Sequence, residues 1–216
     1  MTITDYLPIL DVYAKRHMSI KNATVYNMWT SLKMAGLPMV VRDDDAMMET
    51  SASKLESRGA RLGKVKMGTG HDCYLKGILV TGVFSFPQYM WQQAKRYHWF
   101  DMVSSMSTMH KVIDMANSGA LSFTPDTPVE AVDAFKRVVD NILDNLTTGR
   151  YSDKELFQQL VAAIPSGLML PAGISTNYLQ LKTMYHQRKN HKLDCWREFC
   201  EWCESLPMFK ELIGIE

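Results

Sequence analysis

Two polar side chains three residues apart, Gln93 and Arg96, follow Pro87 in the stretch PQYMWQQAKRYHWF. On a helix, residues three apart lie on one face. The guanidinium of Arg96 is a planar cation that can pair with a phosphate, and the amide of Gln93 can pair with the edge of a pyrimidine. The pair therefore predicts contacts to an anionic nucleotide. A solvated polar helix face uses the same residue types, so that alternative stays open.

A second pair of polar side chains, Asn177 and Arg188, lies eleven residues apart in ISTNYLQLKTMYHQRKNHKLDCW. Eleven residues are about three turns of an α-helix, so both side chains can project along one side of it. An amide and a guanidinium so placed offer further contacts to a nucleotide or cofactor. Taken alone, the spacing is also that of an ordinary helix.

Four further side chains superficially suggest zinc: His191, Cys195, Cys200 and Cys203. Structural zinc takes four ligands that converge tetrahedrally. A single straight helix cannot bring all four side chains to one point. The sequence therefore favours cysteines buried on a helix, and we expect no metal site.

Two other patterns are weak candidates for chemistry. The glycine-rich residues 68–72 (GTGHD) resemble a phosphate loop, but they precede a strand and lack the lysine of such loops, so a turn is favoured. The serines at 104, 105 and 107, taken with His98 and His110, lack the spacing of a hydrolase nucleophile.

The elements that must position these residues follow from periodicity, capping residues and stop signals. Residues 75–86 (LKGILVTGVFSF) predict the main strand, and residues 39–42 predict a short one followed by a solvated turn or cap at 43–45. Ser51 or Ser53 opens the first of two capped helices, with Glu56 three residues after Ser53 in a capping-box pattern, and Ser152 with Glu155 forms another capping box. Helices are predicted over residues 51–62, 88–100, 125–146 (ended by Gly149), 152–163, 176–188 and 193–203. Residues 4–35 are predicted to form short helical pieces, residues 101–124 mostly loop, and residues 165–171 a loop or short strand.

The composition is that of an ordinary globular protein. Of 216 residues, 46% are hydrophobic and 22% charged, and the net charge of +1 supplies no bulk field for nucleic acid or an anionic membrane. The N-terminal stretch lacks the apolar core of a signal peptide or membrane span, so we expect a cytoplasmic protein with free thiols. No linker or repeat interrupts residues 1–216, which predicts a single domain with residues 1–50 as an N-terminal extension.

The order of these motifs resembles the flavin-dependent thymidylate synthase family. That family has a strand, a Pro and a helix carrying Gln-x-x-Arg-His-Arg, then a Ser-containing loop, two helices and a Leu-Pro segment. A helix with an Asn near its start and an Arg eleven residues later follows. The matching positions here are Pro87, Gln93, Arg96, Ile164-Pro165, Asn177 and Arg188. The resemblance covers roughly residues 75–200 and implies an α/β (α+β) fold, with a central sheet packed with helices and a helix-rich C-terminal half.

This chain departs from the family pattern in its first helix and in the loop that follows. The Arg-His-Arg of the family is here Arg96-Tyr97-His98. The family Ser follows the first Arg by ten residues, whereas Ser105 follows Arg96 by nine and Ser107 by eleven. Each lost cation removes charge-assisted hydrogen bonds to a phosphate, at about 1.5–3 kcal/mol per bond. The departures therefore put catalysis in question.

By the resemblance, each matching side chain has an implied role. Contacts to the nucleotide, dUMP in the family, are implied for Gln93, Arg96, Ser105 or Ser107, and Arg188. Contacts to FAD are implied for Arg96, Tyr97, His98 and Asn177, and His71 precedes the main strand where the family has a His-containing segment. The resemblance further implies a homo-oligomer, a tetramer in the family, with sites between subunits.

Two hypotheses from different classes follow. The first is an enzyme that uses flavin for one-carbon transfer or reduction on a pyrimidine nucleotide, a divergent thymidylate synthase-like methyltransferase. The second is a catalytically inactive oligomer on the same fold that binds a nucleotide or a protein partner. Both hypotheses depend on Gln93, Arg96 and Arg188 pointing into one anion-binding pocket.

Overall fold

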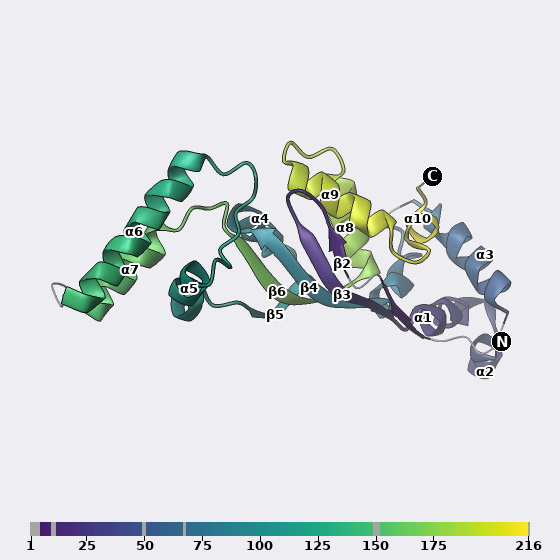
Figure 1. The fold of residues 1–216 in the computed structure, drawn as a ribbon. Helices are drawn as coiled ribbons and strands as arrows, with labels where there is room; N and C mark the ends of the chain where they lie inside the picture. The colour runs from purple at the N-terminus through teal and green to yellow at the C-terminus, as the bar shows by residue number, and fades with distance from the viewer. Residues whose placement is uncertain (1–4, 10–11, 49–50, 67, 149–151, 216) are drawn as a thin grey trace.

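The computed structural model describes residues 5–9, 12–48, 51–66, 68–148 and 152–215 (Figure 1). An antiparallel sheet of six strands, in the order β1-β3-β4-β6-β5 with β2 also paired to β3, runs through the middle. The strands are β1 (Tyr6–Pro8), β2 (Val12–Ala14), β3 (Ser19–Tyr26), β4 (Leu79–Pro87), β5 (Asp101–Ser105) and β6 (Met169–Asn177).

Helices occupy most of the rest of the described chain. The α-helices are α1 (Met28–Met34), α2 (Asp43–Met47), α3 (Ala52–Gly63), α4 (Gln88–Ala94), α5 (Thr108–Asn117), α6 (Val129–Thr148), α7 (Asp153–Ala163), α8 (Tyr178–Arg188), α9 (Asp194–Glu204) and α10 (Phe209–Ile213). Two 3-10 helices are η1 (Leu37–Met39) and η2 (Cys73–Gly77). No described helix combines the length and apolarity needed to cross a membrane. The central sheet and the helices around it confirm the expected α/β fold.

The central pair of strands decides which helices can meet. β4 and β6 pair antiparallel along their whole length, with Leu79 opposite Asn177 and Pro87 opposite Met169. Because α4 follows β4 and α8 follows β6, the two helices start at opposite ends of the sheet. α8 then runs back towards the end where α4 lies, and its last residue, Arg188, contacts α4. The strand pairing thus brings two distant sequence motifs together.

The sheet and the C-terminal helices share one aromatic-rich core. Phe84 and Phe86 of β4 are fully buried and pack edge-on against α9, through Trp202 and Phe199 respectively. The inward face of α9 is apolar along its whole length, and all three of its cysteines are buried there, as predicted. Phe100 also joins this core, so the chain after α4 is tied to the sheet.

A second apolar core holds α5, α6 and α7 together beyond one end of the sheet (Figure 1). It consists of Val112, Phe135, Val139, Ile142, Leu156 and Leu160. α7 begins with the predicted capping box: the Ser152 hydroxyl accepts from Glu155 N, and the Glu155 carboxylate accepts from Ser152 N at 3.1 Å. The predicted stop at Gly149 lies outside the described residues. The single-domain expectation remains a prediction.

The first 50 residues differ most from the sequence prediction. The described residues of 4–35 form three strands where helical pieces were expected, and among them only 28–34 are α-helical. The strands form because β3 pairs with β4, a partner more than 50 residues away, which local periodicity cannot show. The predicted strand at 39–42 is also wrong, because η1 ends at Met39 and residues 40–42 form no strand. The expected turn at 43–45 is the start of α2.

Several helix and strand boundaries near the motifs also differ from the predicted ones. The helix predicted at 88–100 ends at Ala94. Residues 101–124 were predicted to be mostly loop, but they contain β5 and α5. The main strand starts at Leu79 because 73–77 form η2, and β6 extends the possible short strand at 165–171 through Asn177. α3 is capped by Ser51, one of the two serines predicted to open it. The helices predicted at 51–62, 125–146, 152–163, 176–188 and 193–203 are confirmed within a few residues.

Candidate functional site

Four side chains from α4, α8, α9 and the turn after α4 meet at one junction: Gln93, Tyr97, Arg188 and Trp196, here called the Arg188 cluster. The Arg188 Nε donates to the Tyr97 hydroxyl at 2.7 Å, and its Nη1 donates to Gln93 Oε1 at 3.0 Å. The Trp196 indole N–H donates to the same Gln93 oxygen at 3.0 Å. Arg188 is thereby fixed by hydrogen bonds to two neutral groups.

Aromatic rings also surround the guanidinium. The Arg188 Cζ lies 4.5 Å from the Trp196 ring centroid and 5.5 Å from that of Tyr97. Trp196 is fully buried, whereas Arg188 is only partly buried. Such contacts are cation–π interactions, which hold a cation in place and leave its charge uncompensated. The cluster is a rigid cation on an aromatic base.

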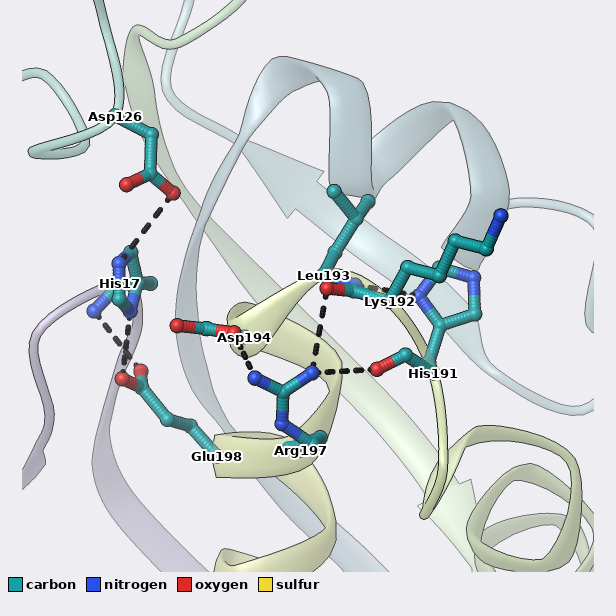
Figure 2. A network of polar contacts seen from close by, with 8 residues as sticks. All are labelled: His17, Asp126, His191, Lys192, Leu193, Asp194, Arg197 and Glu198. Atoms are coloured by element: carbon teal, nitrogen blue, oxygen red, sulfur yellow. Dashed lines mark hydrogen bonds and ion pairs between the residues drawn. The ribbon is translucent and has the colours of Figure 1, made fainter.

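The turn between α8 and α9 is clamped by Arg197 (Figure 2). Its Nη1 donates to the backbone carbonyls of His191 at 2.6 Å and Lys192 at 3.2 Å, and its Nη2 forms an ion pair with Asp194. These bonds fix the short connection that sets α9 beside the end of α8. The clamp therefore helps to place Trp196 under Arg188.

The electrostatic field at this junction is positive. Burial and the nearby cations Arg188, Arg197 and Lys192 lower the pKa of His191. Arg188 forms no ion pair with an acid in the described part of the chain, and its Nη2 has no hydrogen-bond partner there. A planar cation with open donors in a positive field is suited to bind an anion.

The structure brings together some of the predicted nucleotide contacts. Gln93 and Arg188 touch, and Tyr97, expected at the flavin, joins them. Arg96 does not: α4 ends at Ala94, so Arg96 lies in the following turn with an exposed side chain. The expectation that Gln93 and Arg96 share one helix is therefore wrong, because the chain turns to bury Phe100.

Ser105 and Ser107 lie elsewhere. They line a cavity of about 450 Å³ together with Gln88 and Gln92 of α4 and Lys95, which caps the end of that helix. A spacing of four residues puts Gln88 and Gln92 on one face of α4, and Gln93 lies on a different face. Within one chain the two predicted serines and the Arg188 cluster are thus separate.

The residues expected at the flavin do not form a cradle within one chain. Asn177 is buried and its Oδ1 accepts from Gln180 N at 2.9 Å, so it caps α8. His98 is exposed with its ring 4.8 Å from that of Trp99, and His71 is exposed in the turn at 68–72. That turn was predicted, and Gly68 and Gly70 both have positive φ, 87° and 81°. Since the matching groups are dispersed or already bonded, they do not fit FAD in the single chain.

Sequence reasoning missed three groups that the structure singles out. Trp196 forms the base of the Arg188 cluster, and its indole bond to Gln93 spans 103 residues of sequence. Lys182 is fully buried and pairs with Asp72 at 2.9 Å. His17 is buried against Glu198 at 2.7 Å (Figure 2). Only long-range contacts define these roles, although the aromatic richness of 195–202 pointed to a packed helix.

Comparison with known proteins gives the fold a name. No model of a known protein family matches the chain, and no curated protein sequence is significantly similar. Solved structures do match. Thymidylate synthase X (ThyX) from Helicobacter pylori with FAD and dUMP is 12% identical, with a TM-score of 0.62 over 88% of this chain and 93% of that chain. A second H. pylori structure, of flavin-dependent thymidylate synthase ThyX complexed with FAD and dUMP, is 16% identical, with a TM-score of 0.57 over 94% and 97%.

A third similar structure has a different described activity. The UMP/dUMP methylase PolB from Streptomyces cacaoi bound with 5-Br dUMP is 10% identical, with a TM-score of 0.64 over 95% of this chain and 96% of that chain. The similarity to ThyX and PolB extends over nearly the full chain. At these identities the comparison establishes the fold, and this chain has the fold of flavin-dependent thymidylate synthases.

Proposed function

We propose that this chain binds a pyrimidine nucleoside monophosphate at the Arg188 cluster. The observation that carries the proposal is that Arg188 is held only by neutral partners, Gln93, Tyr97 and Trp196, and pairs with no acid among the described residues. A charged side chain without an internal counter-charge retains its attraction for an external anion. The phosphate of the nucleotide is the anion that we assign to it.

The arrangement is preorganised for such a ligand. The guanidinium is already oriented by two hydrogen bonds, so little rotamer entropy is lost when it binds a phosphate. The Gln93 oxygen is used twice inside the cluster, which leaves its amide N–H groups to donate to a pyrimidine carbonyl. Exposed Arg96 and His98 lie on the adjoining turn and can extend the contact.

The fold comparisons support the same class of ligand. Two of the similar structures hold dUMP and the third holds 5-Br dUMP, a substituted form of that nucleotide. The shared element is a pyrimidine nucleoside monophosphate. In this chain Gln93 and Arg188 are in contact with each other, which offers such a nucleotide an amide and a guanidinium at one place.

The second candidate function is flavin-dependent one-carbon transfer to that nucleotide. It is favoured by the similar structures that contain FAD and by the methylase description of PolB. Bound flavin would supply the hydride chemistry of such a reaction. The dispersed positions of Arg96, His98 and His71 require an assembly of several chains to build a flavin site. We therefore couple this candidate to a homo-oligomer, a tetramer by the family resemblance.

The first experiment measures the nucleotide-dependent rise in melting temperature. We expect dUMP or UMP to raise the Tm of the wild-type chain, while uridine, which lacks the phosphate, raises it far less. Arg188→Ala should raise the Kd at least about tenfold, because a charge-assisted hydrogen bond contributes about 1.5–3 kcal/mol. Arg188→Lys should recover only part of the loss, since lysine lacks the planar fork.

The matched control is Lys189→Ala, which removes an exposed neighbouring cation whose Nζ lies 6.0 Å from the Tyr185 ring. It should leave the Kd nearly unchanged. An Arg188→Ala protein that shifts with dUMP as wild type does would exclude the Arg188 cluster as the site.

A second experiment separates the two candidate functions. Absorbance of the purified protein, with and without added FAD, reports flavin, and light scattering reports the number of chains. A yellow oligomer that converts dUMP or UMP to a methylated nucleotide supports the enzyme. A colourless protein that takes up no FAD and still binds dUMP supports nucleotide binding alone.

A further inference from the structure

The central sheet has one face that the C-terminal helices cover and an opposite face, here called the open face (Figure 1). Phe84 of β4 packs against α9 and is fully buried, whereas Val83, one residue earlier, is 38% exposed. Successive strand residues alternate between the two faces, so Val83 lies on the open face. α5 approaches that face near Ser85 and Pro171, where Met115 helps to line a cavity of about 380 Å³. Around Val83 the open face remains exposed.

One row of paired residues crosses the open face from β2 to β5. The strand register places side by side Val12, Lys21, Val83, Gly173 and Ser104. Residues directly opposite each other in antiparallel strands share a face. Val12 is 53% exposed, and a Cβ at Gly173 would have a single described neighbour within 4 Å, the Ser104 carbonyl oxygen at 3.9 Å. The row therefore combines exposed valines with a gap at its middle.

Further apolar side chains extend this exposed strip. Val103, the extra residue of the irregularity beside Ser104, is 73% exposed, and Leu79 of β4 is 40% exposed. Contiguous exposed apolar surface marks a contact site, and stacked sheets pack face to face about 10 Å apart. The open face is therefore suited to a partner that presents a flat, apolar surface of its own.

Two charges lie on opposite sides of the strip. Lys21 is on β3, within the row. Asp101 is on β5 and shares the face, because it pairs with Ser175, which in turn pairs with Thr81 of β4. Both charged side chains are exposed, and neither forms an ion pair with another residue that the structure describes. With β4 and β6 between them, the two charges lie about 14 Å apart, at about 4.8 Å per strand.

We infer that this face binds a second copy of the chain, open face to open face. A two-fold axis parallel to the strands, between β4 and β6, sets β3 of each copy over β5 of the other. Lys21 of each copy then lies near Asp101 of the other, and Val83 lies over the gap at Gly173. An axis across the strands would instead set Lys21 beside its own equivalent, and facing like charges are unfavourable. The charges therefore select the first arrangement.

The same two charges argue against other partners. Lys21 and Asp101 balance each other, so this part of the face creates no net field that attracts nucleic acid or an anionic membrane. A surface that complements itself is the property of a two-fold symmetric dimer. The inference goes beyond both candidate functions, neither of which names a contact surface, and it does not depend on nucleotide binding.

Sedimentation velocity on the full chain, without nucleotide, tests the inference. We expect the wild-type chain to form dimers, or a larger even-numbered assembly, as its concentration rises. Val83→Lys should raise the Kd of the dimer at least about tenfold, because it buries a cation without a partner at the centre of the contact. The matched control is Val161→Lys on α7, since Val161 is 36% exposed and lies outside the sheet; it should leave the Kd unchanged.

Charge reversal tests the arrangement of the two copies. Lys21→Glu and Asp101→Lys each create two contacts between like charges, so each variant alone should dimerise at least about tenfold more weakly than the wild type. An equal mixture of the two variants should restore dimers. In the mixed dimer the introduced glutamate faces the introduced lysine, and the remaining Lys21 faces the remaining Asp101.

Circular dichroism of each variant reports separately whether it is folded. If Val83→Lys does not fold, the mixture of the two charge variants decides the question. A wild-type chain that stays monomeric up to its solubility limit, dimers that a folded Val83→Lys leaves intact, or a mixture that dimerises no better than either variant alone would each overturn the inference.

Discussion

The two halves of α8 each hold a cation against the body of the protein, in opposite surroundings. Lys182 is 2% exposed, and its ammonium pairs with the carboxylate of Asp72 at 2.9 Å. Arg188, six residues later, is held by a phenol, an amide and an indole ring. The charge of Lys182 is compensated inside the fold, while that of Arg188 is not. The comparison separates a cation that supports the structure from one that is available to a ligand.

Removing the buried cation should have the largest effect on stability. Lys182→Met leaves the Asp72 carboxylate, which is only 13% exposed, without its partner. Loss of one member of a buried ion pair destabilises by about 3 kcal/mol. Urea unfolding should show this loss in the free energy of unfolding.

Lys189→Met provides the comparison for Lys182→Met. This exposed lysine caps the end of the same helix, and its change should stay within about 0.5 kcal/mol. Equal effects of the two substitutions would show that the Lys182–Asp72 pair adds no stability.

A smaller effect is expected at the start of α8. Asn177→Ala removes the cap in which Asn177 Oδ1 accepts from Gln180 N, and losing such a cap costs about 1 kcal/mol. Asn177→Ser keeps an N-cap oxygen and should recover most of the loss. If Asn177 instead serves a bound flavin, Asn177→Ala would change flavin uptake and leave the unfolding free energy of the flavin-free protein unchanged.

The smallest predicted effect is electrostatic and concerns His191. Burial and nearby cations lower its pKa, and its Nδ1 accepts from Leu193 N at 3.2 Å, as a neutral ring does. The pKa of His191 is lower in the folded protein than in the unfolded chain. Neutral His191 therefore contributes to the free energy of unfolding above about pH 6.5, and this contribution is lost as the pH falls through the folded pKa. A nucleotide phosphate on Arg188 should raise the pKa of His191 by offsetting those cations.

NMR titration of the histidine ring protons with and without dUMP measures this shift. His186 serves as the internal control, because burial, Lys189 and Lys182 lower its pKa, and Arg188 is not among the causes. Equal shifts at His186 and His191 would place the phosphate away from Arg188.

The motifs could be recognised from the sequence more fully than the site could be assembled. Gln93, Asn177 and Arg188 were found from spacing, and their order predicted the fold that the solved structures share. Their contacts were not predictable. Whether Arg96 continues the helix of Gln93 depends on the burial of Phe100, and whether Asn177 faces a ligand depends on the cap of α8.

The sequence by itself determined the helices that carry their own local signals, as α6 does with its apolar period and α7 with its capping box. These signals act between residues three or four apart, so they are visible in the linear chain. Only the tertiary structure decided the three N-terminal strands, which form by pairing along the sheet. It also decided the Arg188 cluster, because Gln93 and Arg188 are 95 residues apart and meet only when β4 and β6 set α8 back towards α4.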